Sequence, residues 1–137
     1  MYDENRTEEL LRKSKNIAVV GISDKTERPS YDVSSYLVRH GFNVIPVNPS
    51  IDTWNGIKAY PDLLSIPSAT KINIVDIFRK SEQVLPVVEE ALKIHPDVIW
   101  MQEGVINIEA AELAKRNNVS VVMDRCIKKE HMRHTLK

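Results

Sequence analysis

A loop rich in hydroxyl and basic side chains directly follows an apolar run near the start of the chain. The run 17–22 reads IAVVGI, and the polar side chains after it include those of Ser23, Lys25, Arg28 and Ser30. Gly21 has no side chain, so its backbone can lie close to a ligand. A helix after this loop would add free N–H groups and the positive end of its dipole. These features predict an anion site suited to a pyrophosphate; a polar βα loop is the alternative.

Two later apolar runs also end in residues that could contact a ligand. Asn48 follows the run 42–47, at a position where NAD-binding units usually carry Asp or Glu, which disfavours NAD. Phe78 ends the run 72–78 and could cover an adenine or a pantetheine arm. Arg79, next to it, could reach a phosphate. The alternative is that Phe78 ends a core strand and Arg79 is solvated.

The single cysteine, Cys126, follows the last apolar run of the chain, 119–123. One cysteine excludes an internal disulfide and suits a reducing cytosol. Two interpretations stay open: a small buried apolar residue, or a thiol that faces the ligand and forms a mixed disulfide with another thiol. Trp54, in the loop 48–56, is expected to be a lid or contact residue, and Trp100 a core residue.

Composition limits the classes of function. The four glycines, at positions 21, 41, 56 and 104, cannot form G-x-G-x-x-G or a P-loop. With 19 basic and 19 acidic residues the net charge is zero, so no general field attracts nucleic acid. No apolar stretch is long enough for a membrane span, and the charged segment 1–16 does not resemble a signal peptide. We expect a cytoplasmic protein that forms a single domain over 1–137 and does not bind nucleic acid or a membrane.

The residues also lack a recognisable catalytic constellation. No G-x-S-x-G or H-E-x-x-H motif is present in the sequence. His131 and His134 have helical spacing, but we identify no third metal ligand and expect solvated side chains. The sequence therefore predicts neither a metal site nor catalytic residues, and favours a binding function.

The candidate residues require a scaffold that brings the ends of the apolar runs together. The runs predict strands at 17–22, 42–47, 57–60, 72–78, 98–102 and 119–123. Amphipathic stretches predict helices at about 5–14, 31–40, 82–94, 108–117 and 127–135, with one helical turn at 61–65 that begins at Pro61. Ser30, Ser81 and Asn107 are the predicted N-caps, and Gly41 is the predicted C-cap.

This alternation of strands and helices is typical of one fold class. We expect an α/β, Rossmann-like, doubly wound fold, with a mostly parallel sheet of five to six strands and helices on both faces. Numbered along the chain, the predicted strand order is 3-2-1-4-5-6. In such sheets ligands bind at the carboxyl ends of the strands, near the reversal of strand order.

Four segments of the chain together resemble a known family. They read VVGISDKTERPSYDVSSYLVRHGFNVIPVNP, DIFRKSE, VIWMQEGVINIEAAELA and VVMDRCIKKEH. The sequence resembles the small stand-alone CoA-binding proteins, which are relatives of the CoA-binding domain in the alpha subunit of succinyl-CoA synthetase. The resemblance runs from about residue 10 to 131, and its motifs are specific as a set.

The resemblance implies that the protein binds coenzyme A, and it assigns parts of the ligand to parts of the chain. The residues that match the phosphate loop are Gly21, Ile22, Ser23 and Lys25, with Arg28 and Ser30 close by. Those that match the adenosine side are Val47 and Asn48, followed by Phe78 and Arg79 at the edge of the fourth strand. Those that match the edge along the pantetheine arm are Met101, Gln102, Glu103 and Gly104.

The same resemblance argues against ligase activity of this chain alone. The larger synthetase uses a phosphorylated histidine on a second domain, and none of the four histidines here has a matching context. We expect a protein that binds CoA or an acyl-CoA without catalysis of its own. The alternatives are an NAD(P)-binding protein and a non-catalytic subunit of an acyl-CoA ligase. Self-association as a homodimer stays open.

Overall fold

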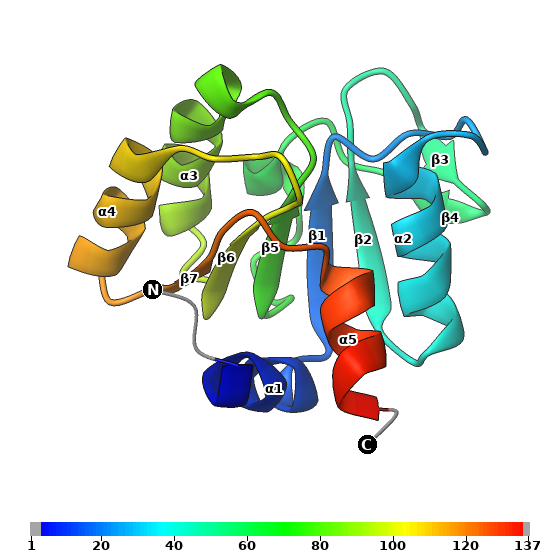
Figure 1. Ribbon diagram of the computed structural model, residues 1–137. Helices are drawn as coiled ribbons and strands as arrows, with labels where there is room; N and C mark the ends of the chain where they lie inside the picture. Colours follow the sequence, from blue (N-terminus) through cyan, green and yellow to red (C-terminus); the bar gives the residue numbers. More distant parts are fainter. Residues whose placement is uncertain (1–3, 136–137) are drawn as a thin grey trace.

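The computed structural model describes residues 4–135, and its centre is a parallel sheet of five strands (Figure 1). These strands are β1 (Asn16–Val20), β2 (Asn43–Val47), β5 (Ile74–Ile77), β6 (Val98–Met101) and β7 (Ser120–Val122). The helices are α1 (Glu4–Lys13), α2 (Pro29–Arg39), α3 (Val84–Leu92), α4 (Ile108–Arg116) and α5 (Ile127–Thr135). The α/β Rossmann-like prediction is confirmed.

The sheet has the order β2-β1-β5-β6-β7, and all neighbouring strands are parallel. This order agrees with the predicted one for five of the six expected strands. The expected strand at 57–60 does not join the sheet as a full strand. Instead β3 (Thr53–Trp54) and β4 (Ile57–Lys58) form a small antiparallel hairpin, which meets β2 through one bridge between Val47 and Tyr60.

The hairpin forms because of the two residues at its turn. Asn55 and Gly56 both have positive φ angles, of 47° and 79°, which match a tight two-residue turn between antiparallel strands. Asn-Gly is a dipeptide that strongly favours such a turn. Because this turn has only two residues, the residues that follow it pair antiparallel with β3 and form β4.

The two faces of the sheet carry separate apolar layers. Along β1, Ala18 and Val20 pack in the layer that includes α3 and α4, whereas Ile17 and Val19 pack in the layer that includes α1, α2 and α5. Figure 1 shows these helices on opposite faces of the sheet. The runs without polar interruption therefore correspond to strands that are buried on both faces.

Two of the predicted N-caps, Ser30 and Ser81, are wrong. Helix α2 begins at Pro29 with Arg28 in the N-cap position, and Ser30 lies inside its first turn. Proline is well suited to the first helical position, because its fixed φ angle is already helical. Ser81 begins a 3-10 turn, η2 (Ser81–Gln83), and α3 starts only at Val84.

The predicted N-cap at Asn107 agrees with the structure, whereas the C-cap of α2 is His40 and not the predicted Gly41. The Asn107 side chain accepts a hydrogen bond of 2.9 Å from the Ala110 N–H at the start of α4. Gly41 is the residue after the His40 cap, and its φ angle of +89° is in the left-handed region that commonly ends a helix. The expected turn at 61–65 is shorter, forming η1 (Leu63–Ser65), and Asp62 rather than Pro61 begins it by accepting from the Ser65 N–H at 2.8 Å.

The prediction for Trp54 is also wrong. Its side chain is only 1% exposed, and its indole N–H donates to the Ser23 carbonyl at 2.9 Å. The hairpin folds this ring back onto the loop after β1, so that Trp54 supports the loop from within. Trp100 is a core residue as predicted, with no exposed surface and a hydrogen bond of 2.8 Å to the Arg125 carbonyl.

No helix among residues 4–135 is both long enough and apolar enough to cross a bilayer.

Candidate functional site

The carboxyl ends of the five strands meet at one edge of the sheet, where the arrowheads in Figure 1 point. An open cavity of about 280 Å³ lies there, beside the loop after β1 and the end of β5. Its lining residues are Gly21, Ser23, Lys25, Arg28, Pro29, Ser30 and Phe78. We call this cavity the first-loop pocket. It brings together six of the residues singled out from the sequence, and adds Pro29.

Gly21 lines the first-loop pocket and also has a structural role in the loop. Its φ angle is +85°, and a Cβ atom built on it would overlap the carbonyl oxygen of Phe78 and lie 3.0 Å from the carbonyl carbon. The space beside Gly21 is therefore filled by the end of β5. Glycine is required here because the loop packs directly on the neighbouring strand.

Hydrogen bonds fix the loop in one conformation. The Ser23 N–H donates to the Ser30 hydroxyl oxygen at 2.9 Å, and the Lys25 N–H donates to the Ser23 hydroxyl oxygen at 3.1 Å. A serine hydroxyl that accepts in this way still has its own O–H to donate. Both serines can therefore donate to an anion in the pocket without disturbing the loop.

The pocket has a positive lining in a loop of mixed charge. Lys25 and Arg28 line it, whereas Asp24 and Glu27, in the same loop, do not. All four side chains are exposed, and no carboxylate of the described residues forms an ion pair with Lys25 or Arg28. These two cations are therefore available to an anionic ligand.

The start of α2 adds to this positive character. Its first turn carries one acidic residue, Asp32, which forms an ion pair of 2.8 Å with Lys128 of α5. The pair offsets the one carboxylate within the first turn of the helix. The helix dipole then favours negative charge at the pocket, since an N-terminus attracts anions.

The predicted adenosine-side residues are engaged within the protein. The Asn48 side chain donates to the Ile22 carbonyl at 2.7 Å and accepts from the Ser50 N–H at 2.8 Å. The Val47 carbonyl accepts from the Gly21 N–H at 3.0 Å, and the side chains of Val47 and Ile22 are buried. These residues hold the two loops together, and Ile22 and Val47 can offer a ligand only backbone groups.

The residues predicted to lie along the pantetheine arm are not part of the first-loop pocket. Met101 is fully buried, and the Gln102 side chain is buried where its Oε1 accepts from the Ile127 N–H at 3.1 Å. Glu103 is exposed and pairs with Lys129 at 2.9 Å. Among these three, only the Glu103 side chain is accessible at this part of the edge. Arg79 is half-buried and does not line the pocket.

A second hydrogen-bonded loop lies at the ends of β6 and β7. The Gly104 N–H donates to Asp124 Oδ1 at 2.7 Å, and the Ser81 hydroxyl accepts from the Ile106 N–H at 2.9 Å. Asp124 and Ser81 were not among the predicted site residues. Both follow apolar runs directly or within a few residues, which is the signal that could have identified them.

Cys126 lies at the same edge and is 8% exposed. Its carbonyl accepts from the Glu130 N–H at 2.9 Å in the first turn of α5. Its burial in the layer of α2 and α5 agrees with the interpretation as an apolar core residue. A reaction of its thiol with the ligand stays a prediction.

Asp76 is an acidic residue inside the apolar core. It lies on the central strand β5, in register with Val19 and Trp100, and has no exposed surface. Neither of its carboxylate oxygens has a hydrogen-bond partner. Burial raises the pKa of Asp76 well above its ordinary value, because the charged form loses its hydration.

The predicted solvation of His131 is wrong. Its Nδ1 lies 2.6 Å from the Tyr36 hydroxyl, and its ring packs edge-on against Phe42 at 5.3 Å between centroids. Burial lowers the pKa of His131, with smaller effects from the neighbouring His40 and His134. No group of three residues suited to hold a metal ion is present in the part of the chain that the structure describes.

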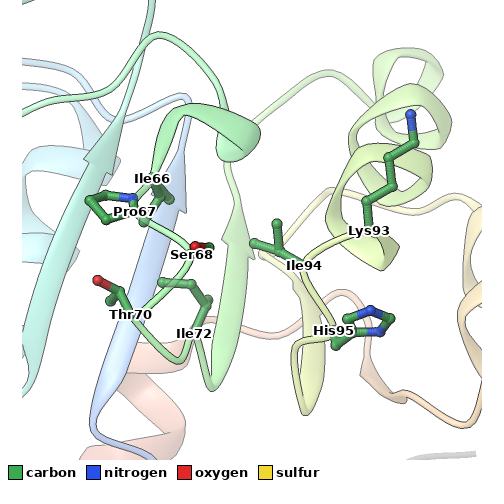
Figure 2. Close-up of a pocket in the computed structure, with 8 residues that line it drawn as sticks. All are labelled: Ile66, Pro67, Ser68, Thr70, Ile72, Lys93, Ile94 and His95. Carbon is green, nitrogen blue, oxygen red and sulfur yellow. The ribbon is translucent and has the colours of Figure 1, made fainter.

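A second cavity, of about 180 Å³, lies away from the predicted ligand edge (Figure 2). It is lined by Ile66, Pro67, Ser68, Thr70, Ile72, Lys93, Ile94 and His95. These residues precede β5 and β6, so this cavity lies at the amino ends of the strands. It shares no lining residue with the first-loop pocket.

Comparison with known proteins adds relatives to this geometry. A family model described as a CoA binding domain matches residues 15–132. The uncharacterized protein YneT of Bacillus subtilis (strain 168) is 45% identical over 123 residues, which cover 90% of each chain. The structure of a hypothetical protein from Pyrococcus horikoshii OT3 has 38% identity and a TM-score of 0.93, and the match covers 98% of this chain and 93% of that one.

Another relative is much longer than this chain, and the match covers only a small part of it. The ADP-forming 4-hydroxybutyrate–CoA ligase of Nitrosopumilus maritimus (strain SCM1) is 29% identical over 133 residues, which cover 88% of this chain and only 19% of the ligase. The region shared with this ligase is therefore a small part of the ligase.

Proposed function

This chain belongs to the CoA-binding domain family, and we propose that it binds coenzyme A or an acyl-CoA at the carboxyl edge of its sheet without catalysis of its own. The observation that carries the proposal is the first-loop pocket. Its cavity of about 280 Å³ combines two cations without carboxylate partners, Lys25 and Arg28, with two serine hydroxyls. This combination suits the phosphates of a nucleotide.

The side chain after β2 supports a ligand with a phosphate on its ribose. CoA carries such a group, the 3′-phosphate, whereas NAD has free ribose hydroxyls. A carboxylate after β2 would favour free hydroxyls and repel a phosphate. Asn48 occupies this position with its amide engaged by Ile22 and Ser50, so the position adds no negative charge.

The width of the sheet supports an extended ligand. Three strand spacings separate β1 from β7 in the observed order, which is about 14 Å across the edge. An extended pantetheine arm spans this distance. If the phosphates bind at the first-loop pocket, the sulfur end of the ligand lies near Gly104 and Cys126, at the ends of β6 and β7.

The proposal assigns binding, and no chemical step, to this chain. None of the described histidines lines the first-loop pocket. A second candidate function, as a CoA-binding subunit of a ligase, is favoured by one observation, the match to part of a longer ADP-forming ligase. Co-purification with a second chain that supplies a nucleotide site would distinguish this candidate from a protein that acts alone.

Calorimetric titration with CoA, dephospho-CoA and NAD tests the proposal. We expect CoA to bind with one molecule per chain, and more tightly than dephospho-CoA, because Lys25 or Arg28 contacts the 3′-phosphate. Equal affinities for CoA and dephospho-CoA would remove that role of the two cations. Tighter binding of NAD than of CoA would favour the dinucleotide alternative.

Variants in the pocket sharpen this titration. Lys25→Gln and Arg28→Gln should each weaken CoA binding by about tenfold or more, because each removes a charge-assisted hydrogen bond. Arg39→Gln is the matched control. Arg39 is an exposed cation in the last turn of α2, at the end of that helix away from the pocket. An equal loss in all three variants would indicate a general charge effect instead of a defined site.

A further inference from the structure

The loop between β6 and α4 and the first residue of α4 present two isoleucines to solvent beside the proposed thiol end of the ligand. We propose, resting on the function above, that the ligand is an acyl-CoA with an apolar acyl group, and that its chain packs on Ile106 and Ile108. These side chains are 46% and 57% exposed. The two are called the isoleucine pair below.

Hydrogen bonds hold this loop in place. The Ser81 hydroxyl accepts from the Ile106 N–H at 2.9 Å, and the Asn107 side-chain amide donates to the Ser81 carbonyl at 2.9 Å. At the other end of the loop, the Gly104 N–H donates to Asp124 at 2.7 Å. The isoleucine pair is therefore exposed on a fixed segment, which costs little conformational entropy when it binds a ligand.

The backbone places both isoleucines on one side. Asn107, between them, has an extended conformation, with φ −145° and ψ 102°. Alternate residues of an extended segment point to the same side. The residues on the opposite side agree with this arrangement, because Val105 is buried and Asn107 bonds to Ser81. The result is a small apolar surface that continues the ligand edge past Gly104.

The charges along the edge match an amphiphilic ligand. At the β1 end, Lys25 and Arg28 have no carboxylate partner among the described residues. At the β6 end, Lys129 is paired with Glu103 at 2.9 Å, so its charge is compensated. Phosphates are therefore favoured at one end of the edge and an uncharged, apolar group at the other.

The size of the surface favours an acyl chain over a protein partner. A stable protein interface buries about 1,000 Å² or more, which two isoleucines do not supply. The other exposed large apolar side chains of the described residues, Val38, Leu64 and Met132, belong to α2, η1 and α5 and do not extend this loop. A single aliphatic chain matches the area that the pair offers.

Titration with CoA, butyryl-CoA and octanoyl-CoA tests the inference. Full burial of one methylene is worth about fourfold in affinity, so a chain half buried on the loop gains about twofold per methylene. Octanoyl-CoA should therefore bind at least about tenfold more tightly than butyryl-CoA. In the double variant I106S/I108S this gain should disappear, while the affinity for CoA itself stays unchanged.

Leu64→Ser is the matched control, because Leu64 is equally exposed, at 51%, and lies on η1. It should keep the gain from the longer chain. Equal affinities of the unaltered protein for butyryl-CoA and octanoyl-CoA, with CoA still bound, would overturn the acyl subsite and leave the proposed function standing. Failure to bind CoA itself would instead overturn the proposed function. A dimer that dissociates only in I106S/I108S would assign the isoleucine pair to a second copy of the chain and refute the subsite.

Discussion

Substitution of Gly21 by alanine tests how the first loop packs on the sheet. The residue combines a φ angle of +85° with direct contact to the end of β5, where a Cβ atom would overlap the Phe78 carbonyl oxygen. Gly41 has nearly the same backbone conformation, with φ +89°, but a Cβ atom added there would meet nothing within 4 Å beyond its chain neighbours. The pair of variants Gly21→Ala and Gly41→Ala therefore separates backbone strain from steric overlap.

The expected magnitudes differ for this reason. Alanine in the left-handed region costs about 1 kcal/mol, and this is the whole effect expected at Gly41. Gly21→Ala adds overlap with a backbone carbonyl that cannot rotate away, and overpacking costs about 1–3 kcal/mol more. We therefore expect Gly21→Ala to lower the free energy of unfolding by about 2–4 kcal/mol.

Urea denaturation followed by circular dichroism measures both variants against the unaltered protein. The same samples report whether CoA binding weakens in Gly21→Ala, since the displaced loop carries Lys25 and Arg28. Equal losses of unfolding free energy in the two alanine variants would refute the close packing between the loop and Phe78.

Three further predictions follow from buried or engaged groups. Because the pKa of Asp76 is raised on folding, the folded protein binds its proton more tightly than the unfolded chain, whose value is about 3.9. The free energy of unfolding should therefore fall as pH rises from about 4 through the folded pKa. Asp76→Asn should reduce this slope in urea denaturation. Parallel pH profiles of the variant and the unaltered protein would contradict the prediction. The Asn48 amide nitrogen lies 2.7 Å from the Ile22 carbonyl oxygen, so Asn48→Asp places a carboxylate against that oxygen. The variant should lower the free energy of unfolding by about 1–3 kcal/mol in the same assay. An unchanged free energy of unfolding would contradict this prediction. Incubation with CoA disulfide should add one CoA to Cys126, as the Cys126 thiolate displaces one CoA thiol. The adduct is measured by intact mass and is reversed by dithiothreitol. An unchanged mass, or equal labelling by oxidised glutathione, would contradict a Cys126 thiol that faces the ligand.

Much of the fold could be predicted because it depends on local patterns of apolar residues. β1 and β5 are rich in β-branched residues and contain one charged residue, Asp76; they are adjacent in the observed sheet, and β5 is its central strand. Strand order followed from the preference for right-handed crossovers. Asn107 was identified as a cap because its side chain and the following helical pattern agree.

The errors arose where two local signals competed. Pro29 and Ser30 both favour the start of a helix, and the proline occupies the first helical position, so the serine is left to accept from Ser23. For Trp54, the sequence indicated only a polar loop. Its burial depends on a hydrogen bond to Ser23, which lies 31 residues away in the chain.

In the candidate site, too, some features could be predicted from the sequence and others could not. The rule that ligands bind at the carboxyl ends of parallel strands predicted the place of Lys25, Arg28 and Phe78. The sequence could not show which polar side chains are already engaged within the protein. Gln102 illustrates this, since its amide oxygen accepts from the Ile127 N–H and is not free for a ligand.

The most direct test of the proposed site is to map the ligand on the protein by nuclear magnetic resonance. In ¹⁵N-labelled protein titrated with CoA, the amide signals of Gly21, Ser23, Lys25 and Gly104 should shift. Those of Ser68 and Thr70, at the cavity on the opposite edge, should stay in place. Shifts confined to the opposite cavity, or no shifts at saturating CoA, would contradict binding at the carboxyl edge of the sheet.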